Sequence, residues 1–600
     1  MNEAIATGVD AVRWDLTHLY SGPEDPNIAG DEATVDRLVE DFQSYRGSLS
    51  QPTVGAAHVE KVLKEYEKIQ FQADRLVVFA ALAAAANQED EKLAALNARM
   101  RERQSRWSAR LVFAELELRR LPVDVLAKLS DNPALKRYRH YLRYQMSLAP
   151  HTLSEAEEQI ILKKNIGGRD AQVRFREEYA ARLNFGSLFI DGVEKPMTFA
   201  SLIALQEGED PELRFKARQR INETFHAQIR IFGFLYGNVV KDHGVEQEIR
   251  SYAEPIDVEN VPNEIPSQVV RNLLDAARRN LPVLHGYYQY KAGKLGVPRL
   301  RTCDLMAPYP GIAPVAIPWS DSRDLVQQAF ARLDPSFGEE VGRFFEEGRL
   351  DAAPRRGKRG GAFCAPVPGH KPHILMSYVD TMSSLVTLAH ELGHGVHFVL
   401  SGSAQTYLQA YSMSKVIAET ASEFGECLLR DQIIETSSDA NLRKQLLVKE
   451  AERFIGVVHR QLLFTEFEIA VHEKAAREPL TAEGLCELWE KMARLHYGPH
   501  VEPIENDRVG WAAVGHFVFN PFYCYSYALS QVVVLALYRK WKREGRKFLP
   551  HYLDLLRGGW SGTPQDLLAQ AGIDLLDPGV LDEAFREFED RIRAAQEAIG

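Results

Sequence analysis

The segment from Val54 to Leu121 limits most strongly what this chain can fold into. It is rich in Ala, Leu, Glu, Lys, Gln and Arg, and it contains no proline. These residues are good helix formers, so an uninterrupted run of them predicts long α-helices. The run stops at Pro122, as a helix does before proline.

Further long helices are expected along the chain, so the sequence predicts a mainly α fold with a multi-helical body. They are expected near 154–182, 211–243, 265–294, 440–476 and 481–496. The 600 residues exceed what one hydrophobic core usually supports. No fixed-period repeat is present, so a solenoid is not predicted.

Two segments interrupt the helical pattern. In SLFIDGVEKPMTF (187–199), Asp191-Gly192 between two short apolar runs predicts a β-hairpin. We therefore place a boundary at 185–205, between an N-terminal helical domain (1–195) and a second domain (196–600). The glycines and prolines of 352–381 exclude a helix, and HILMSYV (373–379) predicts a strand that leads into the next helix.

Composition and charge narrow the class of protein. With 45% hydrophobic and 26% charged residues, the chain has the composition of a globular protein. A net charge of −11 argues against nucleic-acid binding. The five cysteines are scattered without a CxxC pair, which is typical of free thiols in a reducing compartment. No signal sequence is expected, and the apolar stretch at 76–86 is too short to span a membrane. A cytoplasmic location is therefore expected.

The stretch LVTLAHELGHGVHF (385–398) carries an HExxH motif on a helix expected at about 383–400. His390 and His394 are four residues apart, about 40° around a helix and roughly 6 Å along it, so both rings can bind one metal ion. Glu391 lies beside them and can act as the general base of a metallopeptidase. The alternative is a structural histidine pair, but Gly393 and Gly395 favour the metal by leaving room near the backbone.

The third ligand cannot come from an HExxHxxGxxH pattern, because His397 and Leu400 stand where that pattern needs glycine and histidine. The segment VIAETASEFGECLL (416–429) offers carboxylates instead. Three glutamates recur at i, i+4 and i+7 in an otherwise small and apolar helix, which predicts buried carboxylates that need a metal or a partner. Periodicity leaves open which of them is the ligand: Glu419, Glu423 or Glu426.

With these motifs, the chain resembles the M3 family of zinc oligopeptidases, and more closely its oligoendopeptidase F branch. WDLTHLYSGPEDP (14–26), GKRGGAFC (357–364), YGPHVEP (497–503) and HFVFNPFYCYSYALS (516–530) support the resemblance. It implies a helical body split by a deep substrate channel, with a small β element beside the HExxH helix. It also implies one Zn²⁺ per chain, with oligopeptides as the substrates.

The resemblance also implies roles for individual residues. Glu419 is the expected third zinc ligand and Glu423 the carboxylate that orients a ligand histidine. A late segment is expected to reach over the zinc with a histidine and tyrosines, and the register leaves three tyrosines in competition. We expect catalytic roles for His516, Tyr523 and Tyr527, and substrate contacts from Gly360, Gly361, Tyr378 and Tyr525. The strand HILMSYV is expected to pair with an extended peptide, and GKRGGAF either to close over it or to form a basic surface loop.

The expected function is zinc-dependent hydrolysis of internal peptide bonds, with Glu391 as general base. Two alternatives remain open: a helical zinc carboxypeptidase and a non-catalytic peptide-binding scaffold. Cleavage preference and oligomeric state cannot be obtained from the sequence.

Overall fold

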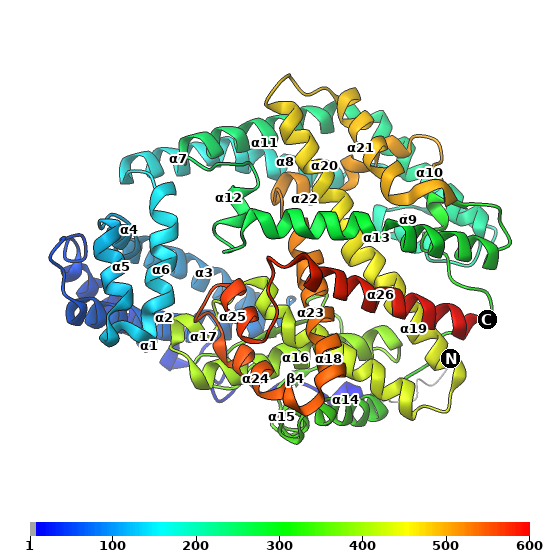
Figure 1. Cartoon of the computed structure of the whole chain (residues 1–600). Coiled ribbons are helices and arrows are strands. Elements are labelled where there is room, and N and C mark those ends of the chain that lie inside the picture. The colour runs from blue at the N-terminus through cyan, green and yellow to red at the C-terminus, as the bar shows by residue number, and fades with distance from the viewer. Residues whose placement is uncertain (1–7) are drawn as a thin grey trace. The chain divides into compact units, whose positions relative to one another are not determined.

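The computed structural model describes residues 8–600 and confirms a mainly α protein with few, short strands (Figure 1). The chain forms two compact units, each assembled from three separate stretches. Unit 1 consists of 1–152, 314–442 and 537–574; unit 2 consists of 153–313, 443–536 and 575–600. The predicted single boundary after residue 195 does not match this division, because the chain passes from one unit to the other several times. The substrate channel stays a prediction.

Unit 1 contains helices, a small sheet and the HExxH segment. Its elements are α1 (Pro26–Phe42), α2 (Ala56–Ala86), α3 (Glu91–Leu111), α4 (Phe113–Arg119), α5 (Val123–Asp131), α6 (Arg139–Leu148), α14 (Trp319–Leu333), α15 (Pro335–Glu346), β4 (Leu350–Asp351), β5 (Phe363–Ala365), β6 (His373–Leu375), α16 (Met382–Ala404), α17 (Tyr407–Ala410), α18 (Lys415–Thr436), α24 (Leu549–Gly558) and α25 (Pro564–Gln570). One of its cores is built mainly from α1–α6.

Unit 2 is also helical. Its elements are α7 (Glu155–Gly167), α8 (Arg169–Ala181), β1 (Ser187–Ile190), β2 (Val193–Pro196), α9 (Phe199–Gln206), α10 (Pro211–Ala227), α11 (Ile229–Ile249), α12 (Asp257–Asn260), α13 (Ser267–Lys294), β3 (Leu300–Arg301), α20 (Arg460–Ala475), α21 (Ala482–Tyr497), β7 (Val501–Glu502), α22 (His516–Phe519) and α26 (Pro578–Ile599). Two helices contain residues of both units: α19 (Ala440–Phe454) and α23 (Cys524–Glu544).

The helical run predicted over 54–121 is divided between α2, α3 and α4. α2 ends before Asn87, whose backbone is extended, and α3 starts after Asp90. The Asp90 side chain accepts the N–H groups of Lys92 and Leu93 and so caps α3. A short polar side chain at a helix start satisfies N–H groups that have no partner within the helix, which outweighs the helix propensity of the surrounding run. By length and composition α2 could cross a membrane, and half of its most apolar window is buried within the protein.

The predicted hairpin is confirmed as β1 paired with β2, antiparallel, and it lies inside unit 2. Asp191 and Gly192 both have positive φ, as the two-residue turn requires. The second interruption forms a three-stranded sheet in the order β4-β6-β5, in which β6 is parallel to β4 and antiparallel to β5. The strand predicted at 373–379 is therefore the central one and spans only His373–Leu375.

Candidate metal centre

The HExxH segment forms the middle of α16, which packs along α18 (Figure 1). The Thr381 side chain caps the start of α16 by accepting the N–H of Ser384. Gly393 lets the two helices approach closely, because a Cβ there would lie 2.4 Å from the carbonyl oxygen of Ala421. A Cβ at Gly425 would lie 3.1 Å from the carbonyl oxygen of Ala389. Gly393 therefore makes room for α18, while Gly395 makes room for Phe344 of α15, 2.3 Å from where its Cβ would lie.

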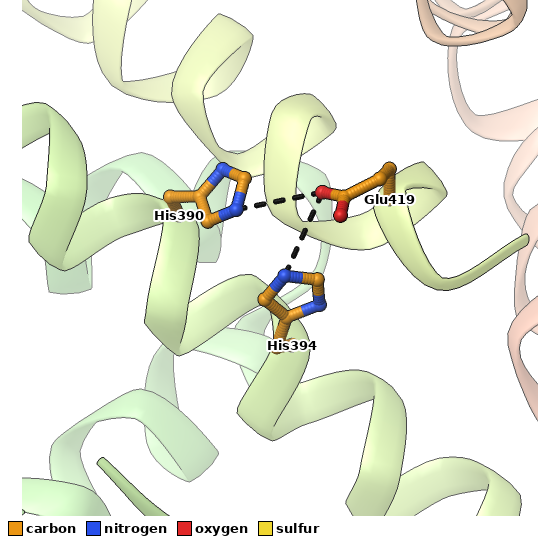
Figure 2. Close-up of side chains that lie close together, drawn as sticks. All are labelled: His390, His394 and Glu419. Carbon is orange, nitrogen blue, oxygen red and sulfur yellow. Dashed lines mark ion pairs between the residues drawn. The ribbon is translucent and has the colours of Figure 1, made fainter. Parts of the chain in front are cut away.

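This approach brings His390, His394 and Glu419 together, as Figure 2 shows. The Nε2 atoms of His390 and His394 lie 3.4 and 3.6 Å from the same oxygen, Oε2 of Glu419. All three ligand atoms lie within 4.8 Å of one another. It is the one such group of His, Cys, Asp or Glu in the part of the chain that the structure describes.

The three side chains fit a metal ion by distance and by chemistry. Four ligands at about 2.0–2.1 Å in a tetrahedron lie roughly 3.4 Å from each other. The two nitrogen–oxygen separations, 3.4 and 3.6 Å, are close to that value. Two imidazoles and one carboxylate are also a common ligand set for Zn²⁺ at catalytic sites, with the fourth position left open. The ligand types and their spacing therefore fit a metal ion.

A second glutamate of α18 holds the other side of His390. Oε1 of Glu426 lies 2.7 Å from Nδ1 of His390, and the Glu426 side chain is 4% exposed. Glu423, which we expected to orient a ligand histidine, is buried one turn earlier on the same helix. The structure shows a contact to His390 from Glu426, and the role of Glu423 stays a prediction. Glu426 was a member of the acidic stripe in the sequence, but its helical period alone could not single it out.

The local charges shift the pKa values of the site in different directions. Burial lowers the pKa of His390, but the hydrogen bond to Glu426 and the charges of Glu426 and Glu419 outweigh burial and raise it to about 9. Burial and the charge of His390 lower the pKa of His394 to about 4. Of the two ligand histidines, His390 therefore carries the proton at neutral pH and must lose it to bind a metal.

Glu391 lies on the buried side of the motif, with 6% of its surface exposed. Burial raises the pKa of Glu391 to about 7, against the opposing effect of His390 and of a hydrogen bond from the backbone N–H of Cys364. Its Oε2 has no hydrogen-bond partner. A buried carboxyl whose pKa is near neutrality is suited to accept and return a proton.

The residues predicted for the late segment lie in unit 2, on α22 and α23. His516 and Tyr523 stack with ring centroids 6.0 Å apart, and the rings of Tyr523 and Tyr527 are 4.9 Å apart. The hydroxyl of Tyr527 lies 3.5 Å from Nε2 of His516. Tyr525, by contrast, is fully buried, so its predicted contact with substrate has no support.

Tyr378 and the strand β6, both predicted to contact substrate, have other hydrogen-bond partners in the structure. Tyr378 is fully buried, its hydroxyl donates to the carbonyl of Ile317 and its backbone N–H donates to Ala352. It therefore has no donor left for a peptide. β6 cannot receive an added strand either, because β4 and β5 occupy both of its edges. The outer strands of this sheet are β4 and β5.

The GKRGGAF loop is anchored at its base. The Lys358 side chain is 1% exposed, lies 2.7 Å from Asp351 and donates to the carbonyls of Asp351, Ala353 and Met376. The backbone N–H of Arg359 donates to the carbonyl of Ala85 at the end of α2. Gly360 and Gly361, predicted to contact substrate, are exposed beyond this anchor. Any movement over a substrate is thus confined to the tip.

Taken together, a helical fold with this centre defines a metallopeptidase. The model of peptidase family M3 matches residues 335–587, and the model of oligopeptidase F matches residues 117–185. The two cover more than half of the chain, which belongs to peptidase family M3.

Individual relatives match over almost the whole length. Oligopeptidase PepF of Bacillus subtilis is 26% identical over 98% of this chain and 87% of its own. An oligoendopeptidase F homolog of Lactococcus lactis is 25% identical over 98% of both chains. Among solved structures, a putative peptidase from Chlamydophila abortus superposes with a TM-score of 0.87 at 22% identity over 98% of both chains. Oligoendopeptidase F from Enterococcus faecium gives a TM-score of 0.71 at 23% identity, over 96% of this chain and 99% of its own.

Proposed function

We propose that this metallopeptidase is a zinc-dependent endopeptidase that cleaves internal bonds of oligopeptides, and that His390, His394 and Glu419 hold its single Zn²⁺. The observation that carries the proposal is the pair of distances, 3.4 and 3.6 Å, from the two Nε2 atoms to one oxygen of Glu419. The names of the relatives, oligopeptidase and oligoendopeptidase, support the substrate class and the internal cut.

Zn²⁺ in such a site supplies Lewis-acid chemistry, activating water and polarising the scissile carbonyl. Glu391 is the proposed general base: it takes a proton from the attacking water and returns it to the leaving amine. A pKa of about 7 lets it do both at neutral pH, and its unpartnered Oε2 is available to receive the proton. Glu426 accepts the Nδ1–H of His390 and so leaves the lone pair on Nε2, the nitrogen that faces Glu419.

The proposed peptide-binding strand is β5. The backbone N–H of Cys364 reaches Glu391, while β5 pairs with β6 along its other edge. The free edge of β5 is therefore the one beside the proposed general base. An extended peptide that adds to this edge would present its backbone carbonyls next to Glu391, and main-chain hydrogen bonds of this kind read shape more than side-chain identity.

His516, Tyr523 and Tyr527 are the proposed donors to the oxyanion that develops on the scissile carbonyl. Their support is that the three rings lie together and that Tyr527 is 39% exposed. A cytoplasmic location is also proposed. It is supported by the five cysteines, which are all free thiols.

The test is to incubate a mixture of short peptides with purified wild-type protein and with Glu391→Gln, and to identify the products by mass spectrometry. Metal content is measured on both proteins. Internal cuts by the wild type, lost in Glu391→Gln although zinc is retained, are the expected result. Single residues released from the C-termini would identify a carboxypeptidase, and intact peptides despite bound zinc would favour a peptide-binding scaffold.

A further inference from the structure

Phe522, which joins α22 to α23, has a backbone conformation that bulky residues rarely adopt. Its φ is +60°, in the left-handed region. Four other non-glycine residues among 8–600 have positive φ, and all four are polar. For an aromatic residue this conformation is strained, and it persists only where the surroundings hold it.

Glu468 on α20 holds the backbone of Phe522. The N–H of Phe522 donates to Oε1 of Glu468 at 2.9 Å. Glu468 is 0% exposed, and its other oxygen has no hydrogen-bond partner. Burial raises the pKa of Glu468 to about 8, so its carboxyl is mostly protonated at neutral pH. Burying this carboxyl away from water costs free energy, so we expect Glu468 to have a function that compensates for the cost.

Two histidines hold the ring of Phe522. The ring centroid of His472, one turn after Glu468 on α20, is 4.6 Å from that of Phe522, and His243 on α11 is at 5.4 Å. Nε2 of His243 lies 2.7 Å from the carbonyl oxygen of Pro255, which fixes this ring in turn. Burial lowers the pKa of both histidines, so they pack here as uncharged rings.

The held residue directly precedes the tyrosines of the late segment. The N–H of Tyr523 donates to the carbonyl of Asn520 at 3.2 Å, which closes the turn around Phe522. After this turn Tyr523 stacks on His516, and Tyr527 follows one helical turn later. The dihedral angles of Phe522 therefore set the direction in which the chain enters α23 and where both tyrosine rings point.

We propose that Glu468, with His243 and His472, is a positioning device: it fixes Phe522 in the left-handed conformation and thereby holds Tyr523 and Tyr527 against His516. The inference rests on the proposed function of these three residues in the peptidase reaction. Glu468 does not touch the substrate; it acts through Phe522.

The first experiment compares Glu468→Gln with Glu468→Leu. The Gln side chain still offers an oxygen to the N–H of Phe522, whereas Leu offers none and is of similar size. We expect Glu468→Leu to lower kcat about 10- to 100-fold, the effect of a displacement of about 1 Å near a reacting group, with KM changed less than about twofold. Glu468→Gln is expected to keep kcat within about threefold of wild type, and zinc content is expected to be equal in all proteins.

A matched control separates positioning from general stability. Val471→Ala removes packing from a fully buried position on the same helix, within a hydrophobic core of unit 2. It is expected to lower the melting temperature while kcat stays near wild type. If Val471→Ala loses as much kcat as Glu468→Leu, the effect is merely structural and the proposal is wrong. Phe522→Ala, which keeps the N–H but loses the ring that packs against both histidines, should lower kcat as Glu468→Leu does.

A second readout does not depend on activity. Hydrogen exchange of the amides at 522–526 should be faster in Glu468→Leu than in wild type or Glu468→Gln. Unchanged exchange in the Leu variant would overturn the positioning device, whatever the kinetics. Faster exchange with wild-type kcat would overturn its role in the reaction. The proposed roles of the late segment are tested separately with His516→Ala, Tyr523→Phe and Tyr527→Phe. If all three variants retain wild-type kcat, the late segment takes no part in the reaction, and it is the proposed function of these residues that is wrong.

Discussion

Glu426 holds His390 in the metal centre, with 2.7 Å between Oε1 of Glu426 and Nδ1 of His390. The contact fixes the orientation of the ring and directs Nε2 toward Glu419, 3.4 Å away. It links two helices that are adjacent through Gly393, since only a residue without a side chain lets α18 come so near to α16. The geometry of the centre therefore depends on residues outside the HExxH motif.

Glu426→Leu is expected to weaken metal binding about 10- to 100-fold, because loss of the acceptor frees the His390 ring and its tautomer. The measurement is a titration against a chelator of known affinity. Glu423→Leu, one turn earlier on the same helix, is the matched control and is expected to change the affinity much less. The assignment of Glu426 as the orienting carboxylate would be wrong if the Glu423 variant lost the metal and the Glu426 variant kept it.

Gly393→Ala is expected to destabilise the protein by about 1–3 kcal/mol, because the new Cβ would lie 2.4 Å from Ala421 O and 2.5 Å from Ser422 Cα. Calorimetric melting would show this loss. Metal binding is expected to weaken as well, because Glu419 moves away from the histidines. Gly286→Ala in α13 is the control, because a Cβ there meets nothing within 4 Å. That variant should gain up to roughly 1 kcal/mol from helix propensity, and equal effects at the two positions would contradict the packing argument.

Glu468 makes a prediction about pH. Its pKa is raised by burial from 4.5 to about 8 in the folded protein. Between pH 4.5 and pH 8 the carboxyl is ionised in the unfolded chain but protonated in the folded protein. The free energy of unfolding therefore falls progressively as pH rises from 4.5 toward 8. Glu468→Gln does not titrate. Its melting temperature relative to wild type is therefore expected to rise between pH 5 and pH 8.5, by an amount equivalent to about 2–4 kcal/mol. A difference that does not change with pH would show that the carboxyl is ionised when folded.

Local sequence signals predicted the elements that carry the metal ligands. The spacing of His390 and His394 needs only helical geometry, and the resemblance pointed to Glu419, which the structure brings next to both histidines. The partner of His390 could not be predicted in this way, because it depends on the rotation of α18 against α16. The sequence also could not indicate that both edges of β6 are occupied. The strand β4 has only two residues, Leu350–Asp351, too few for any pattern to indicate that it would pair with β6. Long-range packing decides both features.

Lys358 anchors the base of the GKRGG segment, so the segment is not a mobile surface loop over its whole length. Its ammonium and the carboxylate of Asp351 are both 1% exposed, and the ammonium also binds three backbone carbonyls from β4 and the segments after β4 and β6. Lys358→Met would remove the donor to the Met376 carbonyl and one of the two cations beside Asp351, whose carboxylate still pairs with Arg355; we therefore expect a loss of about 1–3 kcal/mol, the cost of a buried polar group left without its partner. Arg356→Met, two residues earlier, removes a cation that is 90% exposed and pairs with Glu89; it should change stability by less than about 1 kcal/mol. Comparable melting temperatures for the two variants would mean that the loop is free to move as a whole, and the anchored base would have to be abandoned.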